Sequence, residues 1–192
     1  LVGIMLGSIS TLIYSSVLRD YQKDRIVAYF NPTETSGDIG FNVNQARIAI
    51  GSGQIFGKGF GNGTQSKRDF LPEHQTDFIF ASFAEEFGLV GSLFILSLYG
   101  IIVAKGLIIS VDKASDPFFA MVTLGITLKI LFEVFINLGT NMGTIPATGI
   151  PLPLISAGGT ITLMTLFSLG IIQSIINSSK ENTKVSKIID NY

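Results

Sequence analysis

The hydrophobic positions divide the chain into long apolar segments separated by polar connections. Three segments, at 78–104, 118–139 and 154–177, hold about 20 mostly apolar residues each, the length that an α-helix needs to cross a bilayer. The third contains only scattered Thr, Ser and Gln, without the polar face that recurs every three to four residues in a soluble helix. The pattern therefore predicts an all-α fold, a polytopic transmembrane helix bundle.

The chain also begins in an apolar run, at 1–17. This run lacks the basic start of a signal peptide and is better interpreted as the end of a spanning helix whose beginning is missing. We expect residues 1–192 to form a single membrane domain that is a fragment of a longer chain.

Basic residues in the connections predict the orientation, because Lys and Arg are retained on the cytoplasmic side. Lysines occur in the connection 105–117 and in the tail 178–192, whereas the connection 140–153 has no basic residue. The tail is therefore predicted to be cytoplasmic. Residues 18–77 then form a large extracytoplasmic loop, in which the spacing of apolar residues predicts short helices.

Composition excludes several functions. The chain has 13 Lys and Arg against 14 Asp and Glu, a balance that gives no reason to expect nucleic acid as a partner. Cysteine is absent, which excludes disulfides and thiolate metal sites, and a single histidine excludes a His-rich zinc site.

A glycine-rich stretch, GSGQIFGKGFGNG at 51–63, suggests a loop whose backbone approaches another group closely. It is not a P-loop, because Gly59 stands where Ser or Thr should bind magnesium. It is either a flexible turn or part of a cationic site formed by Lys58 with Lys67 and Arg68.

The connection before the last apolar segment is rich in proline and glycine. Backbone groups that Pro and Gly leave open at membrane depth must be satisfied by protein or by a water-filled cavity. The stretch is either a kinked helix start or the re-entrant wall of a cavity into which Ser156 offers a hydroxyl.

Lys129 and Glu133 are one helical turn apart, near the middle of the second segment. Each would cost about 2.5–3.5 kcal/mol if it faced lipid, so we expect both to face the bundle and to pair. The pair is either structural or part of a polar pathway.

Asp77 ends a polar cluster at 73–77, where the chain enters the first apolar segment. Thr76 is a candidate N-cap, and Asp77 would then lie in the first helical turn, where the helix dipole favours a negative charge. A carboxylate at this boundary is also suited to act as a general base on the headgroup of a lipid substrate.

Several long motifs in order, PEHQTDFIFASFAEEFGLVG, NQARIAIGSGQIFGKGFGNGTQ and NLGTNMGTIPATGIPLPLISAGGT, resemble the SEDS family of shape, elongation, division and sporulation proteins, typified by RodA and FtsW. The resemblance covers nearly the whole chain. It implies the C-terminal part of a multi-pass protein of the bacterial cytoplasmic membrane. Such proteins are peptidoglycan glycosyltransferases that polymerise undecaprenyl-linked lipid II outside that membrane, for cell elongation or division, with a class B penicillin-binding protein.

The resemblance also assigns roles to residues. In that family the aspartate of the matching motif is the proposed catalytic residue, and here it is Asp77. We expect the following to bind substrate: Lys58, Lys67, Arg68, Glu73, Thr76 and Ser156. Cations, or a divalent metal such as Mg²⁺ or Mn²⁺, would stabilise the leaving diphosphate. The chain departs from the family at Gln75, where many members have His, and at Ala157, where Tyr is common.

Two other functions fit the same residues. A lipid II flippase would use Lys129, Glu133 and the broken helix near Pro151 as its pathway. A non-catalytic scaffold would recruit a penicillin-binding protein and would not need the carboxylate of Asp77.

Overall fold

The computed structural model describes residues 19–30, 38–64, 75–112 and 116–189, and in this part of the chain the regular structure is entirely helical. The helices are α2 (Asp20–Phe30), α3 (Asp38–Gly53), α5 (Ile79–Asp112), α6 (Pro117–Asn141) and α7 (Gly159–Ile189). The prediction of an all-α fold is confirmed. The apolar run 1–17 lies outside the described residues.

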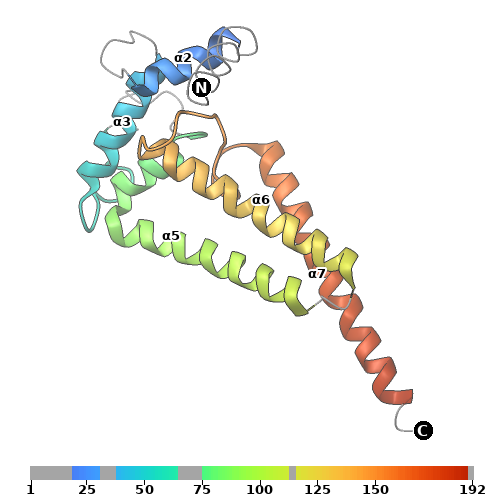
Figure 1. Cartoon of the computed structure of the whole chain (residues 1–192). Coiled ribbons are helices and arrows are strands. Elements are labelled where there is room, and N and C mark those ends of the chain that lie inside the picture. The colour runs from blue at the N-terminus through green and yellow to red at the C-terminus, as the bar shows by residue number, and fades with distance from the viewer. Residues whose placement is uncertain (1–18, 31–37, 65–74, 113–115, 190–192) are drawn as a thin grey trace, which may run out of the picture.

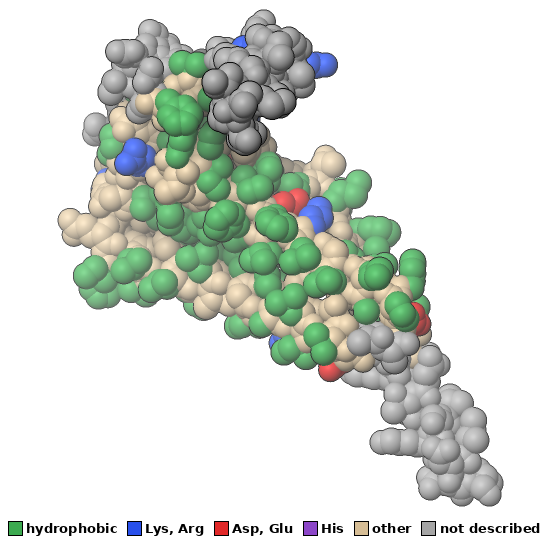
Figure 2. Space-filling view, viewed as in Figure 1, with side chains coloured by type: hydrophobic (Ala, Val, Ile, Leu, Met, Phe, Trp, Pro, Cys, Tyr) green, Lys and Arg blue, Asp and Glu red, His purple; other side chains and the backbone are tan. Residues whose placement is uncertain are grey.

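Three of these helices are long and apolar enough to cross a membrane: α5, α6 and the Gly159–Ser178 part of α7, whose most apolar windows have mean hydropathies of 2.2, 2.0 and 1.7. Figure 1 shows α5 beside α6, with α7 running on toward the C-terminus, and α6 packs against both. Hydrophobic side chains cover most of the visible face of these helices (Figure 2). A surface of this kind is stable in lipid and unstable in water, so the chain is a transmembrane helix bundle.

Three helix limits differ by several residues from the sequence prediction. Helix α5 continues to Asp112 rather than ending at 104, and α7 begins at Gly159 rather than at 154 and continues past 177. Proline explains the late start of α7, because Pro151 and Pro153 have no N–H to donate. The residues between them and α7 form turns instead of a helical turn.

Helices α2 and α3 lie within the predicted extracytoplasmic loop and pack at one end of the bundle (Figure 1). Ala46 and Ala49 of α3 are fully buried against Phe78 and Ala81 at the start of α5. The apolar stripe of α3 therefore packs against the bundle.

Helix α5 is interrupted at Gly88, whose φ of 65° and ψ of −161° are not helical. The glycine-rich loop fills the interruption: Lys58 N–H donates to the Glu85 carbonyl at 3.0 Å, and Leu89 N–H donates to the Gln54 carbonyl at 2.9 Å. Gly59 N–H and Val90 N–H make the matching bonds, to the carbonyls of Glu86 and Ile55. In an unbroken helix the N–H groups of 89 and 90 would have bonded to the carbonyls of 85 and 86.

The loop thus supplies partners for all four backbone groups that the interruption separates. Unpaired backbone groups are costly in lipid, so the interruption requires the loop, and the loop in turn is held at a fixed position. The close approach of the loop to α5 needs glycine in both segments, because a Cβ on Gly88 would lie 2.4 Å from the Gly57 nitrogen. The glycine-rich stretch is therefore an ordered loop that is hydrogen-bonded to α5, and not a flexible turn.

We expect Gly88→Ala to destabilise the protein by about 2 kcal/mol or more, because its backbone region is essentially restricted to glycine. Gly100→Ala in the same helix is the control, since a Cβ there meets no atom within 4 Å. The measurement is the thermal unfolding midpoint of the purified protein in detergent. Equal midpoints for the two variants would contradict the role given to Gly88.

Candidate functional site

Asp77 lies in the turn that precedes α5, not within the helix. The helix begins at Ile79, and its first turn contains no acidic residue. The N–H groups of Ala81 and Ser82 both donate to the Phe78 carbonyl, at 3.1 and 3.3 Å. The sequence prediction of Thr76 as the N-cap and of Asp77 in the first turn was therefore wrong. The reason is that tertiary hydrogen bonds hold residues 75–77 outside the helix.

Two buried asparagines of α6 hold the backbone of Asp77. The side-chain amides of Asn137 and Asn141 each donate to the Asp77 carbonyl at 2.9 Å. Asn137 also donates to the Ile150 carbonyl at 2.9 Å, and Asn141 Oδ1 accepts from Ala81 N–H at 3.0 Å. Both side chains are fully buried, and their i, i+4 spacing puts them on one face of the helix. They connect three segments that are far apart in the sequence.

The proline-rich segment holds the same turn from another side. Ser156 Oγ donates to the Thr76 carbonyl at 2.7 Å and accepts from Leu152 N–H at 2.8 Å. Ala157 N–H donates to the Gln75 carbonyl at 2.8 Å. Ser156 is 4% exposed, so its hydroxyl serves this contact, and its expected role in substrate binding stays a prediction. The turn that carries Asp77 is therefore fixed by side chains from α6 and by the segment before α7.

Arg25 of α2 brings a positive charge to the site. Its Nη1 donates to the Ala147 carbonyl at 2.8 Å, which anchors the guanidinium over the proline-rich segment. A Cβ built on Gly149 would lie 3.5 Å both from Arg25 Nη2 and from Asp77 Oδ2. Gly149, with a φ of 74°, therefore lies close to both the carboxylate and the guanidinium, and a side chain there would contact both.

Lys58, in the loop that follows α3, forms an ion pair with Glu85 of α5. Lys58 Nζ lies 2.7 Å from Glu85 Oε1, which also accepts from the Thr64 N–H at 2.9 Å and from the Thr64 hydroxyl at 2.8 Å. The Glu85 side chain is fully buried, and that of Lys58 is 29% exposed. The charge of Lys58 is thus used to neutralise a buried carboxylate and to fasten the glycine-rich loop. Its expected role in phosphate binding stays a prediction.

Three of the expected substrate-binding residues, Lys67, Arg68 and Glu73, lie outside the described residues. Lys129 and Glu133 form an ion pair, with Nζ and Oε1 2.7 Å apart. The expected pairing is confirmed. The side chain of Glu133 is 16% exposed and that of Lys129 is 43% exposed in this chain, and the expectation that both face the bundle stays a prediction. Both residues precede Asn137 in α6, so the pair lies farther along this helix from Asp77 than Asn137 does.

The expected divalent metal has no evident site in the described ranges. Within residues 19–30, 38–64, 75–112 and 116–189, no group of three or more His, Asp and Glu side chains could hold a metal ion. Asp77 is the carboxylate of the site, and the carboxamides of Asn137 and Asn141 donate to its main-chain carbonyl. Within these ranges no set of side chains is suited to hold a metal ion, and the expected divalent cation stays a prediction.

Sequence reasoning missed Arg25, Asn137 and Asn141. The two asparagines did carry a signal, since they are uncharged polar residues at i, i+4 spacing at the end of an apolar span, where a buried amide needs partners. Arg25 carried no such signal, because it is one of several basic residues in a long polar connection.

Comparisons with known proteins agree on one family. The family model for cell cycle proteins of the FtsW, RodA and SpoVE type matches residues 1–181. The chain is 38% identical over 181 residues to the peptidoglycan glycosyltransferase MrdB of Escherichia coli K12, covering 94% of this chain and 49% of that protein. It is 39% identical over 182 residues to the probable peptidoglycan glycosyltransferase FtsW of Mycobacterium tuberculosis, covering 93% of this chain and 34% of that protein.

A solved structure supports the same fold. It belongs to a study of the structural coordination of polymerization and crosslinking by a peptidoglycan synthase complex. The match has a TM-score of 0.60 and 27% sequence identity, and it covers 88% of this chain and 46% of the solved one. The chain thus spans about half the length or less of the proteins that it resembles.

We expect Asn137→Leu to loosen the turn that carries Asp77, because the Ile150 carbonyl loses a partner and the Asp77 carbonyl keeps only one of two. Hydrogen–deuterium exchange of residues 75–82 should accelerate by about tenfold, as the loss of one buried hydrogen bond of about 1–2 kcal/mol predicts. Thr165→Val is the control, because this buried hydroxyl bonds only within its own helix, to the Ile161 carbonyl. Unchanged exchange in Asn137→Leu would argue against the clamp.

We expect Lys58→Met to destabilise the protein by roughly 1–3 kcal/mol, because it leaves the buried Glu85 carboxylate without its counter-charge. The double variant Lys58→Met, Glu85→Gln should recover most of that loss, since no buried charge then remains. Thermal unfolding of wild type, both single variants and the double variant forms a cycle that measures the coupling. If the losses of stability in the two single variants simply added up in the double variant, the ion pair would contribute nothing to holding the loop in place.

Proposed function

Since the chain belongs to the family of FtsW, RodA and SpoVE cell cycle proteins, we propose that it forms the catalytic part of a peptidoglycan glycosyltransferase. The full protein would polymerise lipid II into glycan strands, and Asp77 would be its catalytic carboxylate. The names of two relatives support this activity: both are described as peptidoglycan glycosyltransferases, one of them as probable.

One observation carries the proposal: Asp77 is the carboxylate of a turn held in place by α6 and the proline-rich segment, next to the guanidinium of Arg25. A general base must be fixed within reach of the proton that it removes, and buried hydrogen bonds to its main chain provide that fixation. Gly149 adds no side chain beside the carboxylate and the guanidinium.

The proposed reaction is a glycosyl transfer. The Asp77 carboxylate accepts the proton of the acceptor sugar hydroxyl while that oxygen attacks the anomeric carbon of the lipid-linked donor. A new carbon–oxygen bond forms to the acceptor, and the bond between the anomeric carbon and the diphosphate breaks. The lipid diphosphate leaves with the bonding electron pair, so negative charge develops on its oxygen.

Arg25 is the residue that we assign to this developing charge. A guanidinium binds phosphate oxygens through two parallel N–H bonds, and the anchor to the Ala147 carbonyl uses Nη1. Such a cation is effective in a site with little water, where it is already oriented when charge develops. We prefer Arg25 to Lys58 for this role, because Lys58 is paired with a buried carboxylate. Lys67 and Arg68 remain further candidates.

The proposed location is the bacterial cytoplasmic membrane, with Asp77 at its outer face and the C-terminus inside. The lysines in the 105–117 connection and in the tail support this orientation. A class B penicillin-binding protein is the proposed partner, which is consistent with the similarity to one chain of a solved peptidoglycan synthase complex. Cell elongation and cell division are both open, because the chain is similar to MrdB and to FtsW alike.

We expect Asp77→Asn in the full-length protein, with its penicillin-binding partner, to lower the rate of lipid II polymerisation by a factor of about 10²–10⁴, the range for loss of a general base. Arg25→Gln should lower it by about 10²–10³, the range for loss of one group that stabilises transition-state charge. Arg19→Gln is the matched control, because it removes the same charge close to Arg25 in the sequence, from an exposed side chain. The measurement is the rate of glycan product formation at saturating lipid II.

Polymerisation by a well-folded Asp77→Asn variant at the wild-type rate would refute the catalytic assignment. A flippase would then become the better hypothesis if substitution of both Lys129 and Glu133 abolished lipid II transport across vesicles. A scaffold would be favoured if neither change affected activity while loss of the whole protein did.

A further inference from the structure

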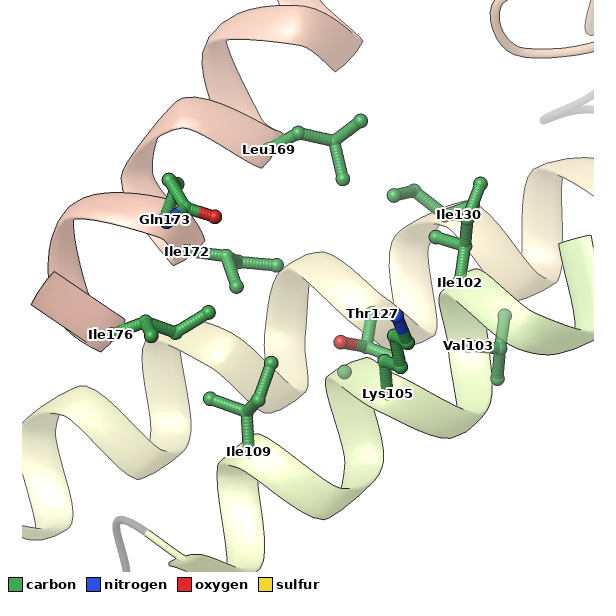
Figure 3. Close-up of a pocket in the computed structure, with 11 residues that line it drawn as sticks. Ile102, Val103, Lys105, Ile109, Thr127, Ile130, Leu169, Ile172, Gln173 and Ile176 are labelled. Carbon is green, nitrogen blue, oxygen red and sulfur yellow. The ribbon is translucent and has the colours of Figure 1, made fainter.

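A groove lies between α5, α6 and α7 at the end of the bundle that is remote from Asp77. Its volume is about 240 Å³. Figure 3 shows side chains from all three helices converging on it, among them Ile102, Lys105, Ile109, Ile130, Ile172 and Ile176. We call it the isoleucine groove. It contains none of the residues to which we have given a role in catalysis.

The floor of the groove is a close contact between α5 and α6. A Cβ on Gly106 would lie 2.2 Å from Thr127 Oγ1, so the two helices touch at this point. The hydroxyl of Thr127 donates to the Thr123 carbonyl at 2.7 Å and is therefore satisfied within its own helix. The contact closes the groove between α5 and α6, while α7 forms the opposite wall with Ile172 and Ile176 (Figure 3).

The size and lining of the groove indicate its occupant. An apolar cavity of this kind holds water poorly. A single hydrocarbon chain is slender enough to fit between the isoleucines, and each CH₂ that it buries is favourable by about 0.8 kcal/mol.

Lys105 adds a charge to the rim of this apolar groove. Among the described residues, no carboxylate forms an ion pair with it, in contrast to Lys58 and Lys129. Lysines near helix ends extend their ammonium group to the membrane interface while their methylene chains cover apolar surface. An ammonium group there is complementary to the phosphate of a lipid whose acyl chain lies in the groove.

We propose that the isoleucine groove binds an anionic glycerophospholipid. One acyl chain lies between α5, α6 and α7, and the phosphate of the headgroup is held by Lys105. With the orientation given above, this lipid belongs to the cytoplasmic leaflet, opposite the catalytic face. The site would brace α7 against α5 and α6, because the acyl chain fills space that the three helices leave between them.

The test uses the full-length protein in detergent with phosphatidylglycerol and phosphatidylcholine of identical acyl chains, at equal concentrations. Native mass spectrometry measures how much of each lipid stays bound. Wild type should retain phosphatidylglycerol about fivefold more than phosphatidylcholine, the ratio that about 1 kcal/mol per interfacial Lys predicts. Lys105→Gln should abolish that preference, and Lys105→Arg should keep it.

A second variant tests the groove itself. Ile109→Trp should reduce retention of both lipids, because the indole occupies the space of the acyl chain. Ile108→Trp is the matched control, since this neighbour is 59% exposed and does not line the groove. Thermal unfolding shows whether each variant is folded. Ile109→Val replaces Ile109→Trp if that protein fails to fold, and because it removes a methyl contact with the acyl chain, weaker retention of both lipids is expected.

Two results would overturn the proposal. Equal retention of the two lipids by wild type would show that the headgroup is not recognised. Retention in Ile109→Trp equal to that in Ile108→Trp would show that the lipid binds elsewhere, as it would if another helix of the full-length protein covered the groove. The assay needs no polymerisation, so its outcome is independent of the proposed catalytic function.

Discussion

At Gly88, the backbone hydrogen bonds of α5 are exchanged for bonds to the glycine-rich loop, and the arrangement of the end of the bundle that carries Asp77 depends on this exchange. The interruption of α5 separates carbonyls at 85 and 86 from the N–H groups at 89 and 90, and the loop at 54–59 supplies a partner for each of them. Because lipid supplies none, neither the interruption nor the loop is stable without the other. The exchange fixes α3 against α5, and the buried pair of Glu85 and Lys58 secures the rest of the loop.

The same requirement operates at the turn before α5. There the chain leaves regular structure, and the open carbonyls of Thr76 and Asp77 accept from Ser156 and from the two asparagines of α6. Buried polar groups of this kind are costly unless all partners are present, so the turn has one low-energy position. The same contacts that make the turn stable therefore also fix the position of its carboxylate.

The charged residues divide into groups with separate tasks. Glu85 and Lys58 form a buried ion pair beside the loop, whereas the side chains of Asp77 and Arg25 both lie close to Gly149. Lys129 and Glu133 pair in the middle of α6, with the lysine partly exposed. Lys105 lines the isoleucine groove.

The sequence by itself determined the membrane helices, because hydrophobic length depends only on the order of residues, and its motifs determined the family. It also identified Asp77 as a boundary carboxylate. Only the tertiary structure decided that Asp77 stands outside α5, that Arg25 lies beside it, and that Lys58 is paired with Glu85. These outcomes depend on hydrogen bonds and ion pairs between residues far apart in the chain. Local propensity can favour a helix start at Thr76, but it contains no information about the asparagines that hold the turn open.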